Sequence, residues 1–297
     1  MISTHPRPLV IIPRLRPTFK PERPQRRKTL SVCIAAISLN PEPYIVTISD
    51  RMVCGVTMSA DSIIVKVEPF HKDWFAMMSA DDLTQCVPII EKAAEYVAGR
   101  ANKLHTIRSA FKRAFSQHLV EMREDTALSK YGLTMKEFLK TGKKKFTERM
   151  FESICKGMDE VSVGCEFIVT GFDSLKKPHI FHVTNQGADG VYDKPGYHCI
   201  GYGRLVADAI LYYFGQSIDR SLYETIFNVC AAKFMAERCA GVGKATYLYA
   251  TKYGNHAFAY VSGMIEAIRR AWDDRGCPRA PEGLIQSIGS TYYPHCE

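Results

Sequence analysis

Four short apolar segments follow one another near the start of the chain, at residues 31–38, 44–49, 62–67 and 74–79. Turn-forming residues such as Asn40-Pro41-Glu42-Pro43 separate them, so the pattern predicts a meander of β-strands. Several of these segments are apolar throughout instead of alternating between polar and apolar residues. Strands of that kind are covered on both faces. We therefore expect a sheet that lies in the interior of a layered protein.

Helical periodicity follows these strands. Asp81 and Asp82 predict the start of a helix that runs through Ala98, and a second helix is expected over about 104–122. Further strands are predicted at 165–172, 178–183, 190–192 and 197–200, helices at about 204–214 and 222–238, and a closing hairpin at 245–251 and 256–261. Separate blocks of strands and helices favour an α+β fold in which two sheets stack with helices outside, rather than a doubly wound sheet.

Residues 125–160 interrupt this order with a charge-rich, weakly helical segment that includes Lys143-Lys144-Lys145. A run of like charges most simply forms a solvated face. We expect a helical insertion that projects into solvent and is a candidate subunit contact.

The composition is that of a soluble globular protein with a large core. The chain has 297 residues, of which 46% are hydrophobic and 24% are charged. No apolar stretch is long enough to cross a bilayer, and the N-terminal segment lacks the continuous apolar core of a signal peptide. The ten cysteines form no CxxC pair and are expected to be buried thiols in a reducing compartment. These features predict a cytoplasmic protein.

Neither a cofactor nor a metal ion is expected. The closest pair of histidines, His179 and His182, falls on a predicted strand, where a three-residue step places the two side chains on opposite faces. A zinc site needs three or four converging ligands. The Gly241-Val242-Gly243 segment follows a helix rather than a strand, which argues against a phosphate-binding loop.

The net charge of +8 is concentrated in a proline-rich leader at residues 1–28. This segment holds eight basic residues, six prolines and a single acidic residue, Glu22. The prolines disfavour an amphipathic helix and predict an extended tail or propeptide. Residues 29–297, which form the predicted domain, are nearly neutral, so no specific nucleic-acid partner and no membrane partner are expected.

Thr29, Asp50 and Lys66 form the least ambiguous chemical pattern in the sequence. A threonine hydroxyl is a weak nucleophile until a base removes its proton, and the α-amine of a first residue, with a reference pKa of about 7.7 to 8.0, is suited to that task. A nearby ammonium such as that of Lys66 would lower the pKa of this amine, and Asp50 would orient the lysine. The three residues therefore predict a nucleophile, a charged partner and an orienting carboxylate.

Four short segments stand in order along the chain, namely Thr29-Leu-Ser-Val-Cys-Ile, Ile48-Ser-Asp50-Arg51, Lys66-Val67 and Met78-Ser-Ala80-Asp81. In these segments the chain resembles the proteasome β-subunit family of N-terminal-nucleophile hydrolases. The steps from Asp50 to Lys66 and from Lys66 to Ala80 fit the family's pattern without gaps. The step from Thr29 to Asp50 is longer than usual, and the excess falls in the turn at 40–43, where insertions are tolerated.

This resemblance implies a four-layer αββα sandwich, with residues 125–160 as a helical insertion, and a set of accessory residues. Ala80 holds the position from which a backbone N–H would stabilise the oxyanion of the tetrahedral intermediate. Tyr202 stands where the family usually has a serine between two glycines. Glu237 and Ala240 stand where it has an aspartate and a serine that support the amine and the lysine.

Two functions follow from the resemblance as expectations. The first is a threonine-type hydrolase, a peptidase or amidohydrolase, that cleaves peptide or other amide bonds as a homo-oligomer after the leader is removed between Lys28 and Thr29. The second is a catalytically silent, proteasome-like scaffold or assembly subunit. Lys28, which replaces the family's processing glycine, favours the second function together with Tyr202 and Ala240.

Overall fold

The computed structural model describes residues 31–54, 59–61, 64–80, 83–184, 187, 189–254, 256–259 and 262–275. The predicted leader at 1–28 and Thr29 lie outside these residues. The described part of the chain forms two five-stranded sheets in which all neighbouring strands are antiparallel, together with a two-stranded ribbon. The predicted α+β class is therefore confirmed.

The first sheet is built around the two strands that the sequence predicts most strongly. Its strand order is β10 (Tyr197–Ile200), β1 (Cys33–Ser38), β2 (Tyr44–Asp50), β11 (Thr246–Lys252) and β12 (His256–Ala259). Every residue of β1 and β2 is buried, as predicted for strands that are covered on both faces. In the register of this pair Ala36 lies opposite Val46.

The second sheet contains the remaining long strands. Its order is β5 (Val67–His71), β6 (Trp74–Ala80), β7 (Cys165–Phe172), β8 (Pro178–Val183) and β9 (Asp189–Val191). A short ribbon pairs β3 (Val53–Cys54) with β4 (Ser59–Ala60). The apolar segment predicted as a strand at 62–67 differs from the structure, because β5 begins only at its last residue. The backbone there is still paired, since the carbonyl of Lys66 accepts a hydrogen bond from the amide of Met78.

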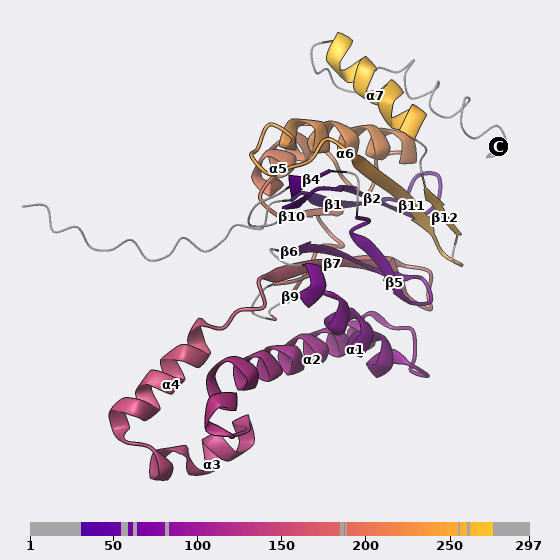
Figure 1. The fold of residues 1–297 in the computed structure, drawn as a ribbon. Helices are drawn as coiled ribbons and strands as arrows, with labels where there is room; N and C mark the ends of the chain where they lie inside the picture. The colour runs from indigo at the N-terminus through magenta and orange to yellow at the C-terminus, as the bar shows by residue number, and fades with distance from the viewer. Residues whose placement is uncertain are drawn as a thin grey trace, which may run out of the picture.

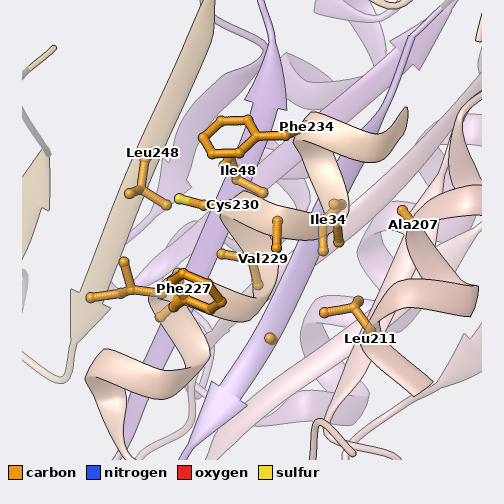
Figure 2. Close-up of a cluster of buried hydrophobic side chains, with 14 of the residues drawn as sticks. Ile34, Ile48, Ala207, Leu211, Phe227, Val229, Cys230, Phe234 and Leu248 are labelled. Atoms are coloured by element: carbon orange, nitrogen blue, oxygen red, sulfur yellow. The ribbon is translucent and has the colours of Figure 1, made fainter. Parts of the chain in front are cut away.

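Helices cover the outer face of each sheet (Figure 1). The first sheet is covered by α5 (Arg204–Tyr213), α6 (Leu222–Ala236) and α7 (Ser262–Asp274). The second sheet is covered by α1 (Val87–Val97) and α2 (Leu104–Arg123). Figure 2 shows the first of these cores, in which Phe227 and Val229 of α6 pack with Ile34 and Ile48 of the sheet. A third apolar cluster, which includes Ile45 and Ile168, lies between the two sheets.

Two helix boundaries differ from the sequence analysis. Asp81 and Asp82, the predicted start of the first helix, lie outside the described residues, and the regular helix begins at Val87 after a 3-10 turn at Leu83–Gln85. Pro88 occupies the first turn of α1, where a missing N–H costs nothing. Helix α7 was not predicted, although its buried residues Met264, Ile265, Ile268 and Trp272 recur at helical spacing.

The predicted insertion is a helical arm that projects from the layered body (Figure 1). It comprises a π-helical turn at Glu124–Leu128, a 3-10 turn at Ser129–Tyr131, α3 (Met135–Lys145) and α4 (Glu148–Glu160). The arm has a small core of its own, formed by Ala127, Leu128, Phe138, Ile154 and Met158. The side chains of Lys143, Lys144 and Lys145 are exposed, as expected for a solvated face.

Candidate functional site

Asp50 is the last residue of β2, and its carboxylate is fully buried. Five groups within the described part of the chain donate hydrogen bonds to it. The donors to Oδ1 are Ser31 Oγ, the Val32 amide and Lys66 Nζ, each at 2.9 Å, and the donors to Oδ2 are the amides of Met52 and Gly243, at 3.1 and 3.4 Å. A carboxylate whose lone pairs are occupied in this way acts as a fixed anion that orients its neighbours.

Lys66 lies immediately before β5, so its ion pair with Asp50 connects the two sheets. Its side chain is only 2% exposed. Removing such a pair of charges from water is costly, and it is tolerated when the geometry is good and additional hydrogen bonds are made. Here the ammonium also donates to Ser31 Oγ at 2.7 Å. The lysine is therefore held between a carboxylate and a hydroxyl.

Ser31 provides that hydroxyl, and it is a candidate site residue that is absent from the set predicted from the sequence. It is 1% exposed, accepts a hydrogen bond from Lys66 and donates one to Asp50. Ser31 and Thr29 are two residues apart, and in extended chain a two-residue step of about 6.6 Å keeps side chains on one face. Alternation along extended chain therefore does not decide between the two hydroxyls. The described residues include Ser31, and Lys66 contacts it.

One signal in the sequence could have identified Ser31. The step along the chain from Thr29 to Asp50 is longer than the pattern of the proteasome β-subunits that the sequence resembles, and the turn at 40–43 is not the only place where the excess can fall. Starting the count at Ser31 shortens this step to 19 residues and reduces the excess. Thr29 itself lies outside the described residues.

Cys33 is the closest thiol to this cluster, with its Sγ 3.9 Å from Ser31 Oγ. The thiol donates to the carbonyl of Met78 at 3.4 Å. Burial raises the pKa of Cys33 to about 12, although the positive charge of Lys66 opposes the shift. A thiol that stays protonated at neutral pH is a poor nucleophile, so the hydroxyl of Ser31 is the better candidate.

A glycine turn holds the main chain of Ser31. The amide of Gly203 donates to the Ser31 carbonyl at 3.0 Å. Gly201 has a φ of +86°, and a Cβ atom at this position would lie 2.5 Å from the same carbonyl oxygen. Only glycine fits here, because both the backbone conformation and the close approach exclude a side chain. Tyr202, predicted as an accessory residue, lies between these glycines and is 38% exposed.

Two further accessory residues, Ala80 and Glu237, occupy different surroundings. Ala80 ends β6 opposite Cys165 of β7, and its side chain packs with the core beneath α1 and α2. Glu237 directly follows α6, where Lys233 Nζ lies 2.5 Å from its Oε1 and Arg269 donates to both of its oxygens. The structure thus brings Asp50, Lys66 and Ser31 together and places Glu237 in a neighbouring cluster.

That cluster supports the site through one loop. Lys233 is fully buried and donates to three backbone carbonyls, those of Gly243, Lys244 and Ala245. The same loop offers the Gly243 amide to Asp50, and the carboxylate of Asp61 accepts from the next two amides. Lys233 and Glu237 therefore fix a segment that contacts the orienting carboxylate.

Three buried hydroxyls near the inter-sheet face have no hydrogen-bond partner among the described residues, namely Thr47 Oγ1, Ser49 Oγ and Ser79 Oγ. Ser79 is the closest of these to the glycine turn, because a Cβ atom on Gly201 would lie 3.0 Å from its Oγ. Buried polar groups are usually paired, so unpaired ones mark places where water or a ligand can bind.

The described residues contain no group of three histidine, cysteine, aspartate or glutamate side chains arranged to hold a metal ion. His179 and His182 lie on opposite faces of β8, as predicted. His179 pairs with Asp193 at 2.7 Å, and His182 pairs with Glu166 at 3.1 Å.

Comparison with known protein families finds no model that matches this sequence, and comparison with curated proteins finds no match either. Among the helices that the structure describes, none combines the length and the apolar character required to span a bilayer.

Proposed function

We propose that this chain is a proteasome-like N-terminal-nucleophile hydrolase of αββα architecture, in which Ser31 supplies the nucleophilic hydroxyl. The observation that carries this proposal is the ammonium of Lys66, buried between the hydroxyl of Ser31 and the carboxylate of Asp50. The two stacked antiparallel sheets, with helices on their outer faces, support the finer fold assignment.

Activation would begin at the peptide bond between Leu30 and Ser31. The Ser31 hydroxyl attacks the carbonyl carbon of Leu30, the C–N bond breaks, and the acyl group moves to oxygen. Water then hydrolyses the ester, which releases the leader with a new carboxylate and leaves Ser31 with a free α-amine. This places the cleavage two residues after the Lys28–Thr29 bond that the sequence analysis proposed.

In the processed protein the α-amine of Ser31 would take the proton from its own hydroxyl as Oγ attacks an amide carbonyl of a peptide or related substrate. Lys66 would keep positive charge next to the developing alkoxide, and Asp50 would hold the lysine in place. Water then releases the acyl-enzyme and restores the hydroxyl. The site needs no group beyond these residues and water for the balance of the reaction.

Intact-mass measurement with a hydroxyl-directed β-lactone tests the proposal. The wild-type chain should lose residues 1–30 and gain one adduct at Ser31. Ser31→Ala should keep its leader and stay unlabelled, whereas Thr29→Ala should be processed and labelled like the wild type. Processing after Lys28 with an adduct on Thr29 would instead establish Thr29 as the nucleophile, and an unprocessed, unlabelled wild type would contradict the proposal.

A catalytically silent scaffold is the second candidate, and one observation favours it. Ser31, Asp50 and Lys66 are all at most 2% exposed, so an uncut chain presents no hydroxyl to a substrate. In that case the ion pair would serve to join the two sheets, and the arm formed by α3 and α4 would serve assembly. A scaffold is expected to keep residues 1–30 in both the wild type and Ser31→Ala, with the same oligomeric state and no β-lactone adduct.

A further inference from the structure

Glu166 is a partly exposed carboxylate at the start of β7, on the face directed toward the other sheet. Its register partner on β6 is Ser79, whose buried hydroxyl has no partner among the described residues. Oε1 of Glu166 accepts the amide of Gly201 at 3.0 Å, and Oε2 lies 3.1 Å from Nε2 of His182. Glu166 therefore connects the second sheet to the glycine turn.

The glycine turn in turn contacts the main chain of Ser31. Gly201 is held so close to the Ser31 carbonyl that no side chain fits between them, and the Gly203 amide bonds to that carbonyl. A carboxylate that holds Gly201 in place therefore also holds the turn that contacts the Ser31 main chain. The hydroxyl of Ser31 is positioned by Lys66 and Asp50 from the other side.

The His182 ring that contacts Glu166 is the first of three rings packed in series. The His182 and His198 rings are 4.7 Å apart, and Tyr192 stacks on His198 at 3.7 Å. Burial opposes ionisation of Glu166, but the hydrogen bonds from His182 and Gly201 outweigh it and hold its pKa below the ordinary value. The carboxylate is thus charged at neutral pH and makes a charge-assisted bond to the Gly201 amide.

We infer that Glu166 is a positioning residue for the Ser31 site, which acts by anchoring the Gly201–Gly203 turn against the Ser31 carbonyl. The inference rests on the proposed function, since it assigns Glu166 a role in the reactivity of Ser31. Glu166 acts through the turn and not on a reacting atom. Small displacements of a reacting group are costly, so loss of this anchor should slow attack by Ser31 about 10- to 100-fold.

The test compares Glu166→Ala, which removes the acceptor for Gly201, with Glu166→Gln, whose amide oxygen can still accept the N–H. Glu224→Ala is the matched control, because Glu224 also accepts a backbone amide, that of Ser221, at the start of α6. Two quantities are measured in each full-length variant. They are the rate of β-lactone labelling at Ser31 and the hydrogen exchange of peptides that contain Val32 and the Gly201–Gly203 turn.

Glu166→Ala should label at least about tenfold more slowly and exchange faster in both peptides, while Glu166→Gln recovers both properties. Glu224→Ala should lose stability without either change. Labelling of Glu166→Ala at the wild-type rate would overturn the inference, as would equal losses in Glu166→Ala and Glu224→Ala. If the wild type never labels, the proposed function fails, and the exchange data alone decide. Faster exchange at both peptides then supports the anchor, and unchanged exchange overturns it.

Discussion

Two lysines are buried in the part of the chain that the structure describes, and they differ in their hydrogen-bond partners. Lys233 is fully buried and is surrounded by acceptors, since its ammonium bonds to Glu237 and to three backbone carbonyls. Lys66 is 2% exposed and bonds to Asp50 and to the hydroxyl of Ser31. The first lysine contacts a carboxylate and backbone carbonyls, whereas the second contacts a carboxylate and a hydroxyl.

The comparison separates a structural cation from a candidate catalytic one. Burial lowers the pKa of Lys233, and Glu237 opposes that shift, as expected for a charge held in place by a saturated set of acceptors. The two clusters meet at Gly243, whose carbonyl accepts from Lys233 and whose amide donates to Asp50. Burial of a lysine is therefore a weak indicator of function by itself, and the chemical nature of its partners is more informative.

Matched substitutions of the two lysines should give the largest effects. Lys66→Met leaves the buried Asp50 carboxylate without its cation and should reduce the free energy of unfolding by about 3–5 kcal/mol. Lys233→Met leaves Glu237 still paired with Arg269 and should destabilise the protein less. Only Lys66→Met should also lower the rate of β-lactone labelling at Ser31, by about 100-fold or more, because it removes a charge next to the reacting oxygen. Denaturant unfolding and labelling rates measure the two effects.

Labelling that survives in Lys66→Met, or that is lost equally in both variants, would break the distinction between the two lysines. The stability data provide the control. A variant that unfolds at the labelling temperature is compared at a lower temperature, where both proteins are folded.

Gly201→Ala should give an effect of intermediate size. The added Cβ would lie 2.5 Å from the Ser31 carbonyl oxygen at a φ of +86°, so strain and displacement should cost about 2–3 kcal/mol and slow labelling. Gly99→Ala is the control, because Gly99 has a φ of +69° but no atom within 4 Å of the added Cβ. It should carry only the conformational cost of about 1–2 kcal/mol. Equal stability and labelling in the two variants would show that the close contact between Gly201 and the Ser31 carbonyl does not position Ser31.

His179 offers a third buried cation and the smallest expected effect. Burial alone would lower its pKa, but the hydrogen bonds and charges of Asp193 and Asp173 outweigh burial and raise it above 6.5. The native state therefore binds a proton more tightly than the unfolded state. This contribution to stability is fully present below about pH 6.5 and is lost as the pH rises through the higher folded-state value.

Melting temperatures across this pH range should show the loss. The wild type is expected to lose more stability than His179→Gln between about pH 5.5 and pH 9. The substitution should change only the pH dependence of stability that His179 causes. Ser31 labelling at a single pH is therefore expected to be similar in both proteins. A larger pH-dependent loss in His179→Gln than in the wild type would contradict the assigned sign.

Much of the fold could be predicted because its signals are local. The strands at 165–172, 178–183 and 197–200 have the predicted bounds, and β1 and β2 are buried on both faces as their apolar composition indicates. The predicted secondary structure differs most from the structure where packing against other segments determines whether a strand or helix forms. The segment at 62–67 contributes a single residue to β5, and α7 owes its place to the core formed by α6 and the first sheet.

The candidate site was predicted only in part. Asp50 and Lys66 follow from their spacing and meet at 2.9 Å. The hydroxyl that Lys66 contacts depends on differences of a few ångströms, which the spacing along the chain does not resolve. Glu166 gave no signal, because a glutamate at the start of a strand is common and its partner, Gly201, is 35 residues away. Contacts at such separations depend on how the two sheets face one another.

The sequence by itself determined the order of strands and helices, the burial of the first two strands, the helical insertion and the presence of an aspartate and a lysine at compatible positions. These follow from periodicity, turn residues and charge, which act over a few neighbouring residues. Only the tertiary structure decided that Lys66 contacts the Ser31 hydroxyl, that Glu237 pairs with Arg269, and that Glu166 bonds to the turn beside Ser31. The reason is physical: hydrogen bonds form within about 3 Å, and only the packing of the sheets and helices brings distant segments that close.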